Sequence, residues 1–133
     1  MAGANAQEGN IKKIEGYEIH YSVFNSDFIT PEVAKAYNIV RGKDKALVNI
    51  SVLKKQADGT LQSVEAQVSG TTSDLIHKKP LDFNVIKENP AIYYLAPFEI
   101  DHKANTYFAI KIKVPNRSTP FNLDFQKTLY ESE

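Results

Sequence analysis

The chain has 133 residues, of which 42% are hydrophobic and 24% are charged, as is typical of one globular domain. Sixteen basic residues balance sixteen acidic ones, so the composition does not indicate the basic face that nucleic-acid binding needs. The absence of cysteine excludes disulfides and thiolate metal sites, and no apolar run approaches the roughly 18 residues that span a bilayer.

The first residues are small and polar, and they show no periodicity. Ala4-Asn5-Ala6 has the small-x-small form of a signal-peptidase site, although no apolar segment precedes it. We expect residues 1–12 to be disordered, or to be a remnant of a signal peptide or of cloning. Residues 13–133 are expected to form a single β-sandwich domain.

A first strand is predicted over Gly16–Phe24, where apolar and polar side chains alternate with a period of two. The next residues, Asn25-Ser26-Asp27, are typical of turns and caps. A helix signal follows, because Thr30 can cap a helix, Pro31 suits the first helical position, and Glu32 complements the positive end of the helix dipole.

The helical insert, Asn25–Arg41, is the most specialised segment of an otherwise plain β scaffold, and connecting segments are where functional residues concentrate. We expect Val33 and Ala36 to pack on the sandwich. Phe28 and Tyr37 decide the role of the insert. If both are buried, the insert is a structural lid, whereas exposed rings would serve as interface anchors.

Six further strands are predicted, and Asp58-Gly59 is the clearest turn signal between two of them. Gly70–Pro80 is expected to be a loop or irregular crossing, and Pro97 implies a bulge or a sheet edge because it cannot donate a ladder hydrogen bond. The six strands are Ala46–Lys54, Leu61–Ser69, a segment marked by Leu81, Phe83 and Val85, Ala91–Ile100, Tyr107–Val114 and Phe121–Leu129.

Alternating strands with one polar face each cannot all bury their apolar sides in a single open sheet. We therefore predict an all-β fold, a two-layer antiparallel immunoglobulin-like sandwich of about seven strands with one short helical insert. A closed barrel is the competing solution. The predicted core includes Phe83, Ile110, Ile112, Leu123 and Phe125.

Three histidines, His20, His77 and His102, lack a diagnostic metal-ligand spacing. Glu18 lies two residues before His20 on the same strand face, which leaves a hydrolase or metal-dependent enzyme with a histidine–carboxylate site as the alternative function. No nucleophile elbow or Gly-rich phosphate loop is present. We predict no catalytic residue, no metal site and no cofactor.

The segments EIHYSVFNSDFITPEVAKAYNIVRG, LVNISVLKK, VSGTTSDL and AIYYLAPFEI resemble a family of small exported gammaproteobacterial proteins that is classified as a domain of unknown function. The resemblance extends from about Tyr17 to Tyr130, and its most specific part is FNSxFxTPEVAxAY. It implies a cleavable signal peptide and hence a periplasmic location. It implies no activity, so no catalytic residue is carried over.

These observations favour a periplasmic, non-enzymatic binding or interaction module. Its partner is expected to be an unidentified protein or small ligand, without nucleic acid and without a membrane span. The candidate partner surface lies on the insert and comprises Phe28, Tyr37 and Arg41.

Overall fold

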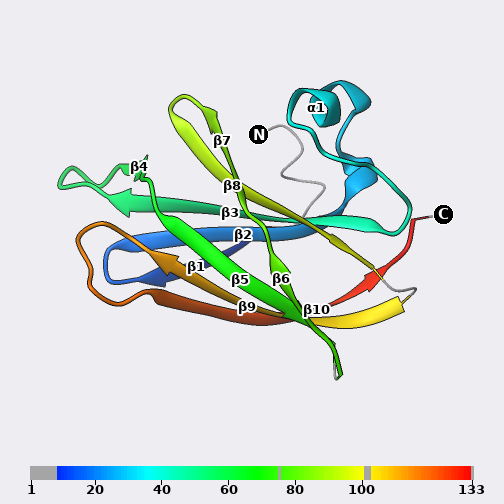
Figure 1. Ribbon diagram of the computed structural model, residues 1–133. Coiled ribbons are helices and arrows are strands. Elements are labelled where there is room, and N and C mark those ends of the chain that lie inside the picture. Colours follow the sequence, from blue (N-terminus) through cyan, green and yellow to red (C-terminus); the bar gives the residue numbers. More distant parts are fainter. Residues whose placement is uncertain (1–8, 75, 101–102, 133) are drawn as a thin grey trace.

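The computed structural model describes residues 9–74, 76–100 and 103–132. Within these residues, ten strands form two antiparallel sheets that pack on each other, which confirms the predicted all-β sandwich against the closed barrel (Figure 1). The strands are β1 Asn10–Ile14, β2 Tyr17–Asn25, β3 Lys45–Lys55, β4 Leu61–Ser63, β5 Gln67–Ser73, β6 Lys78–Leu81, β7 Asn84–Glu88, β8 Ala91–Glu99, β9 Lys103–Lys113 and β10 Phe121–Tyr130. A 3₁₀ turn, Ser26–Phe28, and helix α1, Pro31–Ala36, make up the helical part of the insert.

Sheet A has the strand order β1-β2-β3-β8-β7, and β4 pairs with one end of β3. Sheet B has the order β10-β9-β5-β6. The α1 segment lies on the side of sheet A that faces away from sheet B (Figure 1). None of the helices in the described part of the chain is long and apolar enough to cross a membrane.

The turn predicted at Asp58-Gly59 joins two neighbouring strands, β3 and β4. Gly59 adopts φ +90°, a conformation that residues with a side chain rarely adopt. The Asp58 carboxylate accepts a hydrogen bond from the Thr60 N–H at 3.0 Å, which closes the turn. The Asp-Gly signal is therefore confirmed.

The ordered strands begin earlier than predicted, because residues 10–12 belong to β1 and not to a disordered leader. A tight turn connects β1 to β2 through Glu15 and Gly16, which have φ values of +49° and +85°. The short, lysine-containing strand shows too little apolar alternation to be recognised in the sequence. The Ala4-Asn5-Ala6 triplet lies outside the described residues.

The predicted strand Leu61–Ser69 is two strands in different sheets. β4 pairs with β3 in sheet A, whereas β5 starts at Gln67 in sheet B. The crossing is fixed where the hydroxyl of Tyr94 accepts a hydrogen bond from the Ala66 N–H at 2.7 Å. Alternation in the sequence records which side of a strand is apolar, but not the sheet in which it pairs.

The predicted loop Gly70–Pro80 is also wrong, because it contains the second half of β5 and most of β6. Gly70 lies where a Cβ atom would meet the carbonyl oxygen of Ala109 at 2.6 Å, so the glycine allows β5 and β9 to approach closely. The strand expected around Leu81, Phe83 and Val85 is divided between β6 in sheet B and β7 in sheet A.

Most of the predicted core is buried between the sheets, namely Ile110, Ile112 and Leu123. Phe83 and Phe125 are only half-buried and pack against the core from its margin. The principal core consists of Ile19, Val23, Ala46, Val48, Ile50, Val52, Leu81, Tyr94, Ala96, Ile100, Phe108, Ile110, Ile112, Val114, Phe121, Leu123 and Leu129.

Pro97 occupies a sheet edge, as its missing N–H requires. It pairs with Leu47 of β3 on one side. On the other side β7 pairs with β8 only as far as Leu95, so no described strand needs a hydrogen bond from position 97 there.

Candidate functional site

The insert is closed at its base by Ser26, the first residue of the 3₁₀ turn. The Ser26 hydroxyl donates to the carbonyl of Gly42 and accepts from the N–H of the same glycine, both at 3.0 Å. Ser26 is fully buried, so these two bonds are shielded from water. They hold together two points of the chain that are 16 positions apart.

Asn25 ties the start of the insert to the C-terminal part of the chain. Its side-chain Nδ2 donates to the carbonyl of Tyr130 at 2.8 Å and to the hydroxyl of Ser132 at 2.9 Å. The Ser132 N–H in turn donates to the carbonyl of Lys43 at 2.8 Å. Asn25 and Ser26 therefore form hydrogen bonds to residues that are distant in the sequence. The Asn25 side chain does not cap the 3₁₀ turn that follows it.

Helix α1 begins as predicted. The Thr30 hydroxyl accepts a hydrogen bond from the Val33 N–H at 3.3 Å, and Pro31 occupies the first helical position. The expected inward face is wrong, because Ala34 is buried whereas Val33 and Ala36 are exposed. A helix of six residues buries barely one side chain, and here that side chain is Ala34.

The helix ends in a left-handed residue, Asn38, with φ +57°. The next N–H, of Ile39, donates to the carbonyl of Ala34 at 2.8 Å, which turns the chain back toward the sheet. Ile39 thereby joins a second hydrophobic cluster under the insert. The cluster consists of the buried Phe24, Leu47 and Leu95, with Ile29, Ile39 and Ile86 partly buried against them.

The insert exposes hydrophobic side chains from each of its parts. Phe28 of the 3₁₀ turn is 55% exposed and Tyr37 is 37% exposed, while Val33 and Val40 are also exposed. Arg41 is exposed and forms no hydrogen bond or ion pair with another residue in the described part of the chain. We call these five residues the insert surface.

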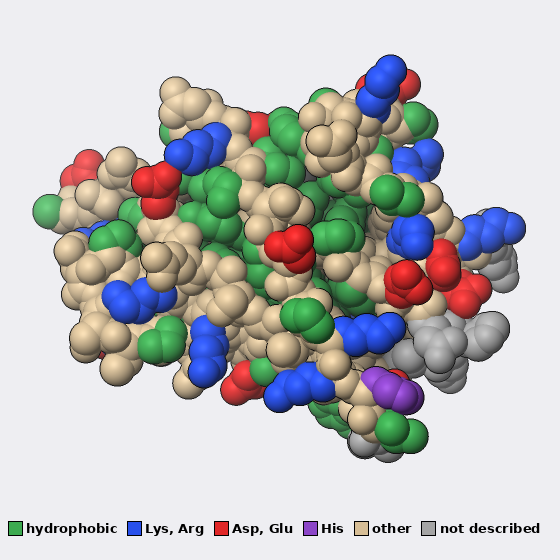
Figure 2. Space-filling model, viewed as in Figure 1, with side chains coloured by type: hydrophobic (Ala, Val, Ile, Leu, Met, Phe, Trp, Pro, Cys, Tyr) green, Lys and Arg blue, Asp and Glu red, His purple; other side chains and the backbone are tan. Residues whose placement is uncertain are grey.

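Tyr37 connects the insert with the β7–β8 hairpin. Its hydroxyl donates to the Glu88 carboxylate at 3.0 Å, and this hydrogen bond raises the pKa of Tyr37. Figure 2 shows hydrophobic side chains in the hollow between the α1 segment and this hairpin. Among the described residues, no hydrogen bond, ion pair or ring contact joins Phe28, Tyr37 and Arg41 to one another. The three side chains belong to one insert, whose ends are fixed by hydrogen bonds to the rest of the domain.

The alternative site, His20 with Glu18, is present as a pair. His20 Nε2 lies 3.0 Å from Glu18 Oε1 on the outward face of β2. Ser51 is the cross-strand neighbour of His20, but its hydroxyl donates to the carbonyl of Ile92 at 3.2 Å. The neighbouring hydroxyl is thus committed to the backbone, and the pair lacks an evident nucleophile.

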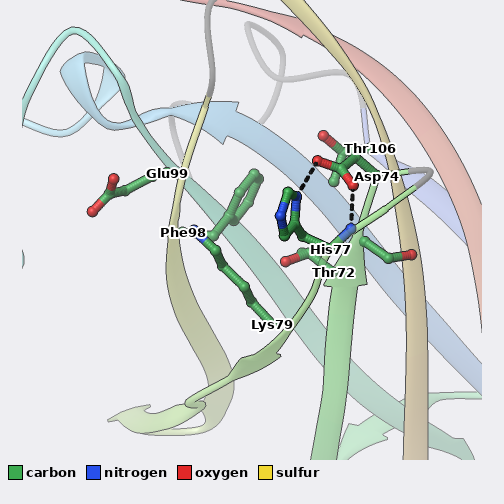
Figure 3. Close-up of a pocket in the computed structure, with 8 residues that line it drawn as sticks. Thr72, Asp74, His77, Lys79, Phe98, Glu99 and Thr106 are labelled. Atoms are coloured by element: carbon green, nitrogen blue, oxygen red, sulfur yellow. Dashed lines mark hydrogen bonds and ion pairs between the residues drawn. The ribbon is translucent and has the colours of Figure 1, made fainter.

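A pocket of about 290 Å³ opens at one end of the sandwich, where the β5–β6 hairpin faces the end of β8 (Figure 3). Sequence periodicity does not reveal this site, because the pattern of Gly70–Pro80 is typical of a loop, whereas the segment contains the end of β5 and most of β6. The only sequence signal was the Thr-Thr-Ser run that precedes the acidic turn. The lining side chains include Thr72, Asp74, His77, Lys79, Phe98 and Thr106.

Asp74 organises the turn beside this pocket. Its Oδ1 accepts the N–H groups of His77 and Ile76 at 2.5 and 2.7 Å, and these hydrogen bonds lower the pKa of Asp74. Its other oxygen, Oδ2, lies 3.6 Å from His77 Nδ1. The imidazole lies between Asp74 and Phe98, as Figure 3 shows, and 73% of the His77 side chain is exposed.

The described residues contain no group of three or more His, Asp or Glu side chains that could hold a metal ion. His20 and His77 each have one carboxylate neighbour, Glu18 and Asp74. His102, the third histidine considered in the sequence, lies outside the described residues.

A family model described as "Domain of unknown function (DUF4426)" matches residues 11–132. A crystal structure of a DUF4426 family protein from Pseudomonas aeruginosa PAO1 is 32% identical to the chain and superposes with a TM-score of 0.82. That match covers 94% of this chain and 97% of the other. Among curated proteins, none is significantly similar in sequence.

More distant structural similarity extends to FetP of uropathogenic Escherichia coli strain F11, isolated after recombinant expression in the periplasm. It is 12% identical, with a TM-score of 0.65 and coverage of 96% of this chain and 97% of that one. A copper-bound variant of FetP is 11% identical, with a TM-score of 0.66 and coverage of 94% and 97%. At these identities the similarity shows a shared fold alone.

Proposed function

This chain belongs to the DUF4426 family, a domain of unknown function, and we propose that it acts as a periplasmic, non-enzymatic interaction module. The insert surface docks a partner protein. The observation that carries this proposal is the exposure of Phe28 and Tyr37 on a segment whose ends are fixed. Exposed aromatic side chains on a preorganised segment lose little conformational freedom on binding.

The fixed ends distinguish the insert from an ordinary surface loop. Ser26 closes its base, Asn25 ties it to the C-terminal residues, and Tyr37 reaches Glu88 on the neighbouring hairpin. These hydrogen bonds have no catalytic role in the proposal, but they fix the conformation of the insert surface. Phe28 is 55% exposed and Tyr37 is 37% exposed, which leaves part of each ring available to a partner.

The periplasmic location rests on the resemblance to exported proteins and on the Ala4-Asn5-Ala6 triplet. The expression of the FetP neighbour in the periplasm agrees with it. The alternative, a histidine–carboxylate enzyme, is supported by the contact between His20 and Glu18 but lacks an orienting third group in the described part of the chain.

We expect Phe28→Ala and Tyr37→Ala each to weaken partner capture about tenfold or more while leaving the melting temperature nearly unchanged. Truncating an exposed anchor removes contact with the partner and little packing within the domain. The measurement is crosslinked capture from periplasmic extract at graded bait concentrations, with thermal unfolding of each variant.

Leu61→Ala is the matched control, because Leu61 is also an exposed hydrophobic residue but lies on β4, away from the insert in sequence. A specific partner should be retained by this variant. Undiminished capture by both Phe28→Ala and Tyr37→Ala would exclude the insert surface as the docking site.

We also expect the chain to bind neither zinc nor copper tightly, in contrast to the copper-bound FetP variant. The two described histidines each have a single carboxylate neighbour, which is too few ligands for a tight site. Titration calorimetry on chelator-treated protein tests this expectation. Stoichiometric submicromolar binding that is lost in His20→Ala or His77→Ala would refute it and favour a metal-handling role.

A further inference from the structure

The interior-facing surface of sheet B becomes polar at the pocket beside the β5–β6 hairpin. Thr72 pairs with Phe108 on one side and with Lys79 on the other, so all three side chains project from the same face of the sheet. Phe108 is buried in the core, which identifies this face as the inner one. Thr106, two residues before Phe108 on β9, shares it.

Lys79 therefore starts from the inner face of β6, the edge strand of sheet B, and its exposed side chain reaches water. The Lys79 ammonium group forms no hydrogen bond or ion pair with any other described residue, although its backbone belongs to the ladder with β5. Two carboxylates, Asp74 and Glu99, also line the pocket. Asp74 Oδ1 accepts backbone N–H groups, and its Oδ2 lies 3.6 Å from His77 Nδ1. Glu99 lies 3.9 Å from Lys45. In Figure 3, Lys79 extends toward Phe98 whereas Glu99 points away.

The remaining walls combine an aromatic surface with hydrogen-bond donors. Phe98 is half-buried and meets the ring of Phe108 edge-on at 5.4 Å, which fixes its orientation. The His77 imidazole, 3.6 Å from Asp74 Oδ2, and the side chains of Thr72 and Thr106 line the same cavity. A lysine ammonium group with hydroxyl and imidazole donors next to one aromatic wall suits an anionic group that is attached to a small apolar body.

We propose that this pocket binds a small organic carboxylate. The carboxylate lies at Lys79 and His77, and the apolar body of the ligand rests on Phe98. The volume of about 290 Å³ is at the lower end for ligand pockets and suits a molecule of about one ring. The site is built from other residues than the insert surface, so it does not depend on the partner-docking proposal.

Sodium benzoate is the probe, and amide chemical shifts of the full chain are the measurement. Benzoate should cause saturable shifts concentrated at Thr72, Lys79 and Phe98, whereas neutral benzamide at the same concentrations should cause none. Lys79→Gln should weaken benzoate binding about tenfold, because it removes the charge-assisted hydrogen bond and leaves a side chain of similar length.

Lys111→Gln is the control, since Lys111 is an exposed lysine of the same sheet whose neighbours in register are Ser69 and Asn122. This variant should bind benzoate as the unmodified chain does. Phe98→Leu should weaken benzoate binding as well, because the leucine removes the ring surface. Shifts that do not saturate, equal shifts with benzamide, or undiminished affinity in Lys79→Gln would each overturn the proposal.

Discussion

Replacing Phe108 with alanine is expected to lower the free energy of unfolding by about 3–5 kcal/mol, the largest effect of any single substitution considered for this chain. Phe108 is one of the largest fully buried side chains. Its truncation removes apolar surface from the interior and leaves a cavity that the two sheets cannot fully close, and both terms are unfavourable.

The position of Phe108 between the sheets strengthens this expectation. Its ring stacks on the ring of Phe125 in sheet B, with 4.6 Å between the ring centroids. It meets the ring of Phe98 in sheet A edge-on, with 5.4 Å between the centroids. Phe125 in turn lies 4.7 Å from Tyr21 of sheet A. The four rings cross the interface between the layers, so loss of the central one loosens contacts on both sides.

Urea denaturation measures the effect, with an unchanged slope as the sign that unfolding remains two-state. Tyr107→Ala is the matched control, because this aromatic residue precedes Phe108 on β9 but is exposed. It should cost under about 1 kcal/mol. Phe125→Ala should rank between the two, since Phe125 is half-buried. A loss under about 1 kcal/mol for Phe108→Ala would contradict the assignment of this face as the interior.

The alternation of apolar and polar residues predicts which side of a strand is buried, and this sets how much of the fold can be predicted from the sequence. Where one side of a strand is buried, as in β9 and β10, the period of two appears directly in the sequence, and strands were expected there. The Asp58-Gly59 turn is predictable for a local reason, because its geometry requires a positive φ.

Sheet membership is a different kind of information. The chain crosses from sheet A to sheet B between Ser63 and Gln67 without breaking the alternation, so nothing local signals the change. The same limit hid β6, whose Lys78, Lys79 and Pro80 are typical of a loop in isolation. Pairing with β5 makes this segment a strand, and the pocket beside it is visible only once the two sheets are assembled.

The insert was partly predictable for the same reason. Its helix start depends on local capping, and Thr30 and Pro31 take the predicted positions. The roles of Asn25 and Ser26 depend on Tyr130 and Gly42, which are remote in sequence, and no local rule connects them.

Ser26→Ala is expected to lower the free energy of unfolding by about 1–2 kcal/mol. The alanine leaves the N–H of Gly42 without its partner, and an unsatisfied backbone group costs about 1–3 kcal/mol when buried. The Gly42 carbonyl keeps the hydrogen bond from the Lys45 N–H at 3.2 Å, and Gly42 is only half-buried, so the expected loss lies toward the lower end of that range.

Hydrogen exchange separates a local from a global effect in this variant. With its base opened, the insert should lose amide protection at Ala34 and Ile39, whose N–H groups bond within the insert, before the strands lose theirs. Ser118→Ala is the control, because Ser118 is exposed in the connection between β9 and β10, and it should change stability by under about 0.5 kcal/mol.

The same variant links the architecture of the insert to its proposed role. Ser26 is buried and cannot touch a partner, yet Ser26→Ala should weaken capture by the insert surface, because a loosened segment must be ordered again on binding. Weakened partner capture together with faster amide exchange at Ile39 would support the proposal that the fixed ends of the insert hold Phe28 and Tyr37 in position for binding. Stability, exchange and capture all equal to those of Ser118→Ala would show that the Gly42 bonds do not hold the insert in place.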